Sequence, residues 1–259
     1  MSQVVQDLFT SIAPKYGRLN TILSLGQDRR WRKIAARHLQ EQRNILDLCA
    51  GTLSLTEALL ETNPTARITA IDFSEAMLEI GMKKLPKEFR TQVAINCSDF
   101  YKWQPNITGV GERRIHSAGE VRVAAPRYDA VMCAYGMRNL DDNPAALQKI
   151  HQLLTNKGRL VILEFFRPDH WLMKFFHATY AQFVIPTIGR LISRHEGAYA
   201  HLRDSIRGFY TLDEYCQSLR ETGFEVKVAK QLTGGISGLI VAEKSPQPPF
   251  FKVGQEENL

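Results

Sequence analysis

Short apolar runs alternate with segments of helical spacing along most of the chain. Each apolar run is short enough for one strand, and most of them end in an acidic residue or a glycine. The segments between the runs place their apolar residues on one face of a helix. This alternation predicts a Rossmann-like α/β fold, with a mostly parallel, twisted sheet and helices on both faces. The expected strands are 44–51, 67–74, 92–100, 128–136 and 158–166, and the expected helices are 53–62, 75–85 and 146–154, the last closed by the turn Asn156-Lys157-Gly158.

Four segments depart from this alternation. Residues 1–40 have helical spacing and are expected to form a helical cap. Residues 104–127 are polar and aperiodic, which predicts a loop or a short β-excursion. Residues 168–210 form a long amphipathic stretch, which predicts a helical insert or lid, and the proline-rich residues 245–259 are expected to be a disordered tail. We therefore expect a single domain over residues 1–244.

Composition narrows the class of protein. With 44% hydrophobic and 23% charged residues over 259 positions, the chain can form a core without disulfides or metals. The four cysteines form no CxxC pair, and we expect them to be reduced and buried. Neither a signal-peptide pattern nor an apolar stretch of membrane-spanning length occurs, so a cytoplasmic location is expected. The net charge of +6 is compatible with an anionic ligand, an anionic lipid surface or RNA.

Acidic residues stand at the ends of three consecutive predicted strands. After Asp47, Gly51 lets a ligand approach the backbone, and the following helix offers free N–H groups. Asp72 can accept hydrogen bonds from both hydroxyls of a ribose, and Asp99 can accept one from an adenine amino group. The dinucleotide pattern G-x-G-x-x-G is absent. The set fits S-adenosylmethionine as cofactor, whereas each acid taken alone can also be a helix N-cap.

A second polar group follows the fourth predicted strand. Arg138 and Asn139 stand in the segment Tyr-Gly-Met-Arg-Asn-Leu, at a strand tip that faces the crevice of the sheet. The alternative interpretation is structural, with Arg138 in an ion pair and Asn139 capping the helix at 143–154. The seven histidines show no metal-ligand spacing, so no metal is expected.

These motifs, together with others in the chain, occur in the order typical of one family. They are FTSIAPKYGRLN (9–20), SLGQDRRWR (24–32), LDLCAGT (46–52), IDFSEAML (71–78), YGMRNL (135–140), KGRLVILEF (157–165) and the stretch 199–239. The chain resembles the ubiquinone/menaquinone biosynthesis C-methyltransferases, which are class I S-adenosylmethionine-dependent methyltransferases, and above all their demethylmenaquinone methyltransferases. The resemblance covers nearly the whole chain outside 104–127 and the tail.

The resemblance implies a function and a cofactor site. The expected reaction is the methylation of a ring carbon of a polyprenyl quinol, with S-adenosylmethionine as donor, in menaquinone or ubiquinone biosynthesis. Thr52 would contact the methionine part of the cofactor and Asp72 the ribose. Asp99 and Phe100 would frame the adenine, and Ala134 stands where many relatives have serine.

The resemblance also implies which residues face the substrate. Arg138 and Asn139 would face the quinol ring, and Tyr16 would close over the site. The reduced quinol is the expected substrate, because a deprotonated hydroxyl makes the neighbouring ring carbon electron-rich. Since a guanidinium stays protonated, we expect Arg138 to stabilise the developing phenolate and Asn139 to place a water that takes the proton.

The chain departs from the family pattern at several positions. Leu53 and Ser54 stand where relatives usually have glycine and aspartate, which is expected to narrow or reshape the methionine end of the pocket. Gly17 replaces an aspartate, His201 a tyrosine and Ile240 a histidine. Two alternatives therefore stay open. One is a methyltransferase for another small phenol or for RNA, and the other is a non-catalytic relative that serves as a structural partner in quinone biosynthesis.

A polyprenyl quinol lives in a bilayer, so peripheral contact with the inner face of the membrane is expected. The aromatic residues of the insert at 168–210 suit a lid or an interfacial surface, or alternatively a core or dimer interface, so a homodimer is compatible with the sequence. The basic residues around Trp31 suit anionic headgroups or a solvated helix face. The two narrow family motifs, at 9–20 and 135–140, argue against a nucleic-acid partner.

Overall fold

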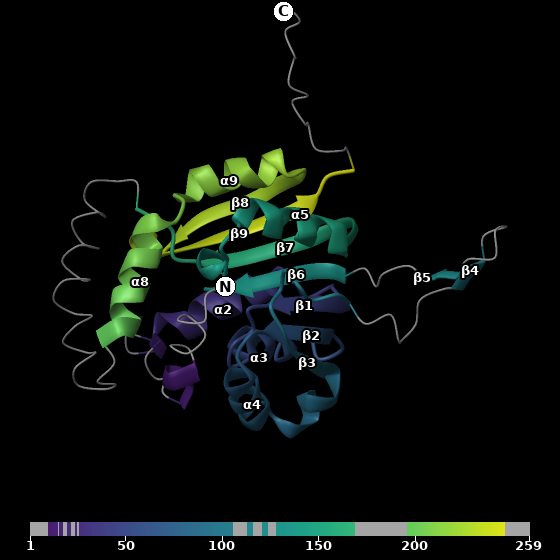
Figure 1. Ribbon diagram of the computed structural model, residues 1–259, viewed down its shortest axis with the longest axis horizontal. Coiled ribbons are helices and arrows are strands. Elements are labelled where there is room, and N and C mark those ends of the chain that lie inside the picture. Colours follow the sequence, from purple (N-terminus) through teal and green to yellow (C-terminus); the bar gives the residue numbers. More distant parts are fainter. Residues whose placement is uncertain are drawn as a thin grey trace, which may run out of the picture.

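A seven-stranded sheet forms the centre of the fold, with the strand order β3-β2-β1-β6-β7-β9-β8 (Figure 1). Neighbouring strands from β3 to β7 are parallel, and β9 is antiparallel to both β7 and β8, which confirms the predicted mostly parallel α/β sheet. The strands are β1 (Asn44–Leu48), β2 (Arg67–Asp72), β3 (Val93–Cys97), β6 (Tyr128–Ala134), β7 (Leu154–Glu164), β8 (Phe224–Leu232) and β9 (Ser237–Lys244). The computed structural model describes residues 10–14, 16–17, 20–21, 24, 26–105, 113–115, 121–123, 128–168 and 196–246.

Helices cover both faces of the sheet. One apolar core lies under α5 (Asn143–Leu153) and α9 (Leu212–Glu221), and a second lies under α2 (Gln27–Arg37) and α3 (Ser54–Leu60) on the opposite face. The helix α4 (Glu75–Lys84) adds Leu78 to the second core. Because successive strand residues point to opposite faces, β1 contributes Leu46 and Leu48 to the first core and Ile45 to the second.

The strand order creates a crevice between β1 and β6. From β1 the sheet grows through β2 to β3 on one side, and from β6 it grows to β7 on the other. The connections that leave β1 and β6 therefore diverge at the carboxyl ends of these strands. Ligands of open α/β sheets bind at such a switch point. The helix α8 (Glu196–Gly208) stands beyond these strand ends and contacts the short helix η2 (Met137–Asn139) (Figure 1).

The predicted junction between the helix at 146–154 and the strand at 158–166 differs from the structure. The helix α5 ends at Leu153 rather than at the turn 156–158, because Leu154 already pairs with Tyr128 in the sheet. Within the predicted turn, Lys157 and not the glycine has the left-handed φ of 61°. Gly158 is required for another reason, since a Cβ atom there would lie 2.9 Å from the Thr155 carbonyl oxygen.

The predicted β-excursion within 104–127 contains two short antiparallel strands, β4 (Arg113–Ile115) and β5 (Val121–Val123). Of the predicted insert 168–210, residues 196–208 form α8, and residues 169–195 lie outside the described residues. The predicted tail from residue 247 also lies outside them. The helices among the described residues include none that is long and apolar enough to cross a bilayer.

The cysteines are all unpaired, but they are not all buried. Cys133 and Cys216 are buried, and Cys49 is half-buried at the crevice. Cys97 is exposed, which corrects the expectation of a buried thiol. The reason is its position on β3, which is an edge strand of the sheet with few buried residues.

Candidate active site

A cleft that encloses about 530 Å³, open to solvent, lies at the carboxyl ends of β1, β2 and β6. Its walls are the loops that follow these three strands, together with side chains from α2 and α4 and from the amino-terminal segment. The strand order alone thus brings together side chains that are far apart in the chain. Six predicted site residues line this cleft, namely Tyr16, Gly51, Thr52, Asp72, Ala134 and Asn139.

A second hollow of about 310 Å³, also open to solvent, adjoins the cleft. It contains two further predicted residues, Asp99 and Phe100. Cys49, Asp72 and Phe73 line both hollows, so Asp72 lies between them. Eight of the ten predicted residues are therefore brought together around two adjoining hollows, and Asp47 and Arg138 line neither.

Asp72 is held by backbone N–H groups of the loops that follow β1 and β2. The Gly51 N–H donates to Asp72 Oδ2 at 2.9 Å, and the Ser74 N–H donates to Oδ1 at 2.9 Å. Each oxygen keeps a lone pair for a further hydrogen bond. Burial raises the pKa of Asp72 to about 6, and the backbone hydrogen bonds oppose this rise. At neutral pH the carboxylate is ionised and can accept from two neighbouring hydroxyls, as a ribose would require.

The loop after β1 turns sharply beneath the cleft. Cys49, Gly51 and Leu53 all have a left-handed φ, of 55°, 52° and 57°. This conformation explains why a glycine suits position 53, and leucine there carries a strain of about 1 kcal/mol. The Leu53 side chain points into the core and is 1% exposed, so it does not narrow the cleft. Helix α4 approaches this loop closely at Gly81, where a Cβ atom would lie 2.8 Å from the Thr52 carbonyl carbon.

Asp47 lies behind the wall of the cleft. Its side chain points to the face that is covered by α3, where the Thr56 hydroxyl donates to Asp47 Oδ2 at 2.6 Å. Burial raises the pKa of Asp47 to about 7, although the Thr56 hydrogen bond and the charge of Arg32 both lower it. A direct contact between Asp47 and the cofactor stays a prediction, and the geometry favours a supporting role through α3.

Replacing Asp47 with asparagine is expected to stabilise the protein at neutral and higher pH. Asparagine keeps an acceptor for Thr56 and removes a buried charge. Because the folded pKa of about 7 lies above the ordinary 3.8, the unfolded state loses its proton first, and stability falls as the pH rises from about 4 to about 7. Urea unfolding across this range should show the wild type losing up to about 4 kcal/mol relative to Asp47→Asn. Parallel pH profiles for the two proteins would contradict this assignment.

The second cavity has a rigid wall. The Lys149 ammonium donates to the carbonyl oxygens of Phe100 and Trp103, each at 2.6 Å, and lies 4.9 Å from the centre of the Phe100 ring. The Tyr101 N–H donates to Asp99 Oδ1 at 2.9 Å. These contacts fix an aromatic ring and a carboxylate side by side, as recognition of an adenine requires.

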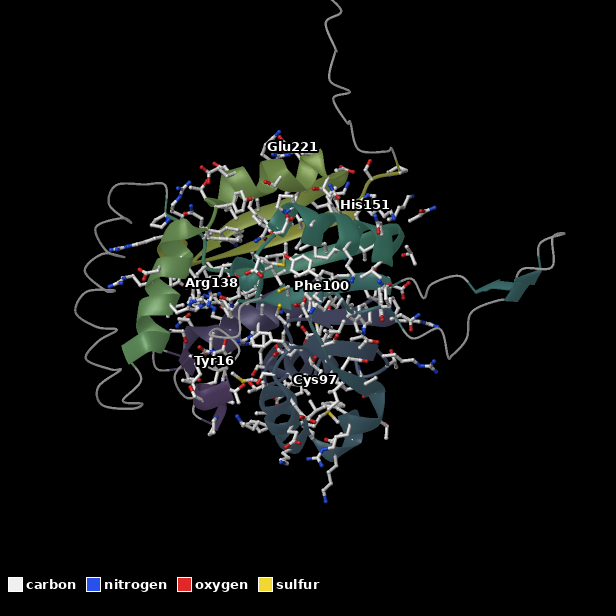
Figure 2. The ribbon with its side chains drawn as sticks, viewed as in Figure 1. Tyr16, Cys97, Phe100, Arg138, His151 and Glu221 are labelled. Atoms are coloured by element: carbon white, nitrogen blue, oxygen red, sulfur yellow. The ribbon has the colours of Figure 1, made fainter. Side chains whose placement is uncertain are left out.

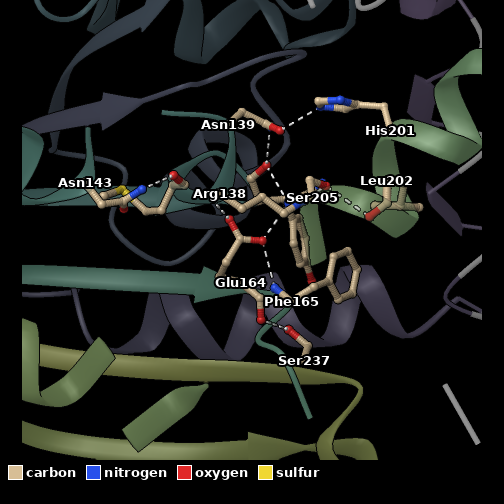
Figure 3. A network of polar contacts seen from close by, with 11 residues as sticks. Arg138, Asn139, Asn143, Glu164, Phe165, His201, Leu202, Ser205 and Ser237 are labelled. Carbon is tan, nitrogen blue, oxygen red and sulfur yellow. Dashed lines mark hydrogen bonds and ion pairs between the residues drawn. The ribbon is translucent and has the colours of Figure 1, made fainter. Parts of the chain in front are cut away.

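Arg138 forms a buried ion pair with Glu164 at the end of β7 (Figure 3). Its Nη1 donates to Glu164 Oε1 at 2.6 Å and to the Tyr135 carbonyl at 2.8 Å, and its Nε donates to Ser205 of α8 at 3.3 Å. The Phe165 N–H also donates to Glu164 Oε1, at 2.7 Å. The side chains of the pair are 5% and 0% exposed. This geometry agrees with the structural interpretation of Arg138, and its direct contact with a quinol stays a prediction.

Asn139 connects the cleft to α8. Its Nδ2 donates to the Tyr135 carbonyl at 3.4 Å, which leaves Oδ1 to accept from His201 Nε2 at 3.2 Å (Figure 3). Burial and the charge of Arg138 lower the pKa of His201, while Asp204 raises it, so its imidazole is neutral at pH 7. Asn139 does not cap α5, because the side chain of Asp142 accepts from the Ala145 N–H there.

Tyr16 reaches the cleft from the amino-terminal segment. This segment packs through Ile12 and Ala13 on Met77 of α4, and the Thr10 and Ser74 hydroxyls lie 3.4 Å apart. Tyr16 lies on the same side of the molecule as Arg138 and α8 (Figure 2). Tyr16 therefore borders the cleft, and its closure over the site stays a prediction.

Sequence reasoning missed three residues around the site. The basic run around Trp31 predicts headgroup contact or a solvated helix face for Arg32, whereas this residue is buried and lines the cleft. The helical period could have predicted the burial of Arg32. Asp28, Arg32 and Ala36 are spaced four residues apart on one face of α2, and all three are buried. Glu164 lies in a family motif but within an apolar run, and the sequence marks His201 only as a departure from the family pattern. Their roles depend on contacts between β7, η2 and α8.

Comparison with known proteins identifies the family. The model of the ubiE/COQ5 methyltransferase family matches residues 1–106 and 112–244. The chain belongs to this family. Its relatives include a demethylmenaquinone methyltransferase of Deinococcus radiodurans, at 35% identity over 93% of both chains. A ubiquinone/menaquinone biosynthesis C-methyltransferase of Geotalea uraniireducens is 34% identical over 93% of this chain and 96% of its own length.

Solved structures extend the likeness to the fold. The magnesium protoporphyrin IX methyltransferase of Synechocystis PCC 6803, determined with bound S-adenosylhomocysteine, superposes with a TM-score of 0.62 at 16% identity, over 93% of this chain and 99% of the other. Human N-acetylserotonin methyltransferase in complex with S-adenosylmethionine gives a TM-score of 0.58 at 17% identity, over 93% of this chain and 59% of the other. The class I methyltransferase fold expected for this family member is therefore present.

Proposed function

We propose that this protein transfers a methyl group from S-adenosylmethionine to a ring carbon of a polyprenyl quinol in quinone biosynthesis. Family membership supports the reaction class, since relatives over nearly the whole chain are demethylmenaquinone and ubiquinone/menaquinone biosynthesis methyltransferases. The observation that carries the proposal is the position of Asp72, an ionised carboxylate between two hollows at the switch point of the sheet.

The two hollows fit the parts of this cofactor. The Asp72 carboxylate would accept from both ribose hydroxyls, and the cavity with Asp99 and Phe100 would take the adenine. The amino-acid part would then extend into the larger cleft, past Gly51 and Thr52. When bound, the cofactor supplies an electrophilic methyl group on a sulfonium, so the protein has only to align that group and the ring carbon.

The remaining cleft residues would act on the quinol. Asn139 projects into the cleft beside Tyr135, and we infer that its amide orders the water that takes the proton of the quinol hydroxyl. His201 holds the Asn139 amide in this orientation through the bond to Oδ1. Tyr16 would cover the ring from the amino-terminal side. Arg138, fixed by Glu164, would contribute its charge from behind Asn139 and hold α8 through Ser205.

The exposed face of α2 suits the membrane from which this substrate would come. Arg29, Arg30 and Arg37 are exposed, and Lys33 pairs with Glu61 at 3.0 Å. Cations near an anionic bilayer each contribute about 1 kcal/mol of attraction. We infer peripheral contact with the membrane through this exposed face of α2. Arg32 lies on the opposite side of the same helix, toward the cleft.

The function is tested by methyl transfer from radiolabelled S-adenosylmethionine to demethylated quinols in vesicles. Reduced naphthoquinol and benzoquinol are assayed separately, each against its oxidised quinone. We expect product with at least one quinol, none with the quinones, and faster turnover on anionic than on neutral vesicles. No product with either quinol, from a protein that binds the cofactor, would contradict the proposal, and label recovered in added tRNA would favour the RNA alternative.

A further inference from the structure

Arg32 is a buried cation at the wall of the cleft. It lies on the inner side of α2, is 7% exposed and lines the larger hollow. The helix that carries it is fixed, because Trp31 Nε1 donates to the Thr233 hydroxyl at 2.9 Å and the Trp31 ring packs edge-on against Phe165. Arg32 therefore has a defined position relative to the loops after β1 and β6.

The guanidinium of Arg32 has no anionic partner within the described part of the protein. Its Nε is buried without a hydrogen-bond partner, and its Cζ lies 5.0 Å from the centre of the Tyr135 ring. Tyr135 is in turn stacked on Phe165 at 4.5 Å. An aromatic face stabilises a cation but accepts no conventional hydrogen bond, so the Nε N–H of Arg32 stays unsatisfied. Burying a charge without a partner is costly, and such a group indicates a ligand of opposite charge.

The nearby carboxylates are engaged elsewhere. Asp28, one turn earlier on α2, accepts from the Ser24 hydroxyl at 3.2 Å. Asp47 accepts from Thr56, and its pKa of about 7 leaves it half protonated at neutral pH in spite of Arg32. Asp72 is bound by two backbone N–H groups. Ser54, which lines the same cleft, is neutral and therefore offers Arg32 no opposite charge.

We propose that Arg32 binds the carboxylate of the methionine part of S-adenosylmethionine. This inference rests on the proposed cofactor. With the ribose at Asp72 and the adenine in the hollow of Asp99 and Phe100, the amino-acid part must enter the other hollow, which Arg32 lines. A guanidinium matches a carboxylate through two parallel hydrogen bonds. The phenolate of the quinol is the competing anion, and the test separates the two.

The test compares two ligands by calorimetry on the full chain. S-adenosylhomocysteine carries the carboxylate, and its decarboxylated analogue lacks it. We expect the wild type to bind S-adenosylhomocysteine about 10- to 100-fold more tightly than the analogue, as for a charged hydrogen-bonded pair. In Arg32→Met this preference should disappear, and the loss should fall entirely on S-adenosylhomocysteine. Arg32→Lys should keep part of the preference, and the exposed neighbour Arg30→Met should keep all of it.

A readout without ligand completes the test. Because Arg32→Met removes a buried unpaired charge and retains an apolar side chain beside Tyr135, its thermal midpoint without ligand should equal or exceed that of the wild type. A preference for the carboxylate that persists in folded Arg32→Met overturns the inference, as does unchanged S-adenosylhomocysteine affinity with a raised KM for the quinol. Tight, Arg32-dependent binding without quinol methylation would support the inference and count only against the proposed substrate.

Discussion

Asp72→Asn is expected to weaken S-adenosylmethionine binding at least 100-fold at neutral pH. The carboxylate accepts one backbone N–H on each oxygen and would accept one ribose hydroxyl on each as well. In the asparagine variant, an NH₂ group replaces one of these acceptors and faces a donor from the protein and a donor from the ligand. Two lost hydrogen bonds to a charged group, at about 1.5–3 kcal/mol each, correspond to this loss of affinity. Isothermal titration of the purified variant measures it.

The same group predicts how cofactor binding depends on pH. Binding requires the ionised form of Asp72, whose pKa is about 6, so the affinity of the wild type should fall about tenfold per unit below pH 6. The affinity of Asp72→Asn should not change over that range. Asp129→Asn is the matched control, since Asp129 also accepts from two backbone N–H groups, those of Arg43 and Asn44, but stands at the opposite end of the sheet. Affinity of Asp72→Asn within threefold of the wild type would show that Asp72 does not hold the ribose.

Removing either member of the Arg138–Glu164 pair is expected to destabilise the protein by about 3–5 kcal/mol, because the other charge then stays buried alone. Glu164→Ala also removes the acceptor of the Phe165 N–H. For a chain of this size the thermal midpoint should fall by about 10 °C. The double variant Arg138→Met/Glu164→Gln should recover much of this loss. Chemical unfolding of the wild type, the single variants Arg138→Met and Glu164→Gln, and the double variant should therefore give a coupling energy of about 2 kcal/mol or more.

Turnover distinguishes the structural from the catalytic role of Arg138. If the cation stabilises the phenolate, the folded double variant should bind the cofactor normally and lose most of its quinol turnover. If turnover in the folded double variant matches the wild type, Arg138 serves only to position α8 and η2. Arg167→Met provides the comparison for stability, because Arg167 pairs with Glu214 at 2.7 Å on the surface, where an ion pair contributes at most about 1 kcal/mol.

Much of the site followed from local sequence, because strand ends in a parallel sheet converge. Asp72 and Asp99 stand near the ends of predicted strands and Asn139 follows another, and the structure places all three at the two adjoining hollows. Asp47 did not follow this rule. It is the fourth residue of β1 and still inside the strand, so its side chain is directed to the face under α3 rather than to the cleft.

Charge partners could not be read from the sequence in the same way. Arg32 and Arg30 are two positions apart on one basic helix, yet the first is buried at the cleft and the second is exposed. Arg138 lines neither hollow, and its guanidinium is bound by Glu164, 26 positions later. Such pairings depend on which strands are neighbours, which the residue pattern alone does not state.

The sequence by itself determined the α/β alternation, the acidic strand ends and the family, since these depend on residues close together in the chain and on motifs in a fixed order. The tertiary structure decided which charges meet. It placed Arg32 at the wall of the cleft without an ion-pair partner among the described residues, paired Arg138 with Glu164, and set His201 of α8 against Asn139. The physical reason is burial, because the free energy of a charge in the interior depends on the partner that the fold places beside it.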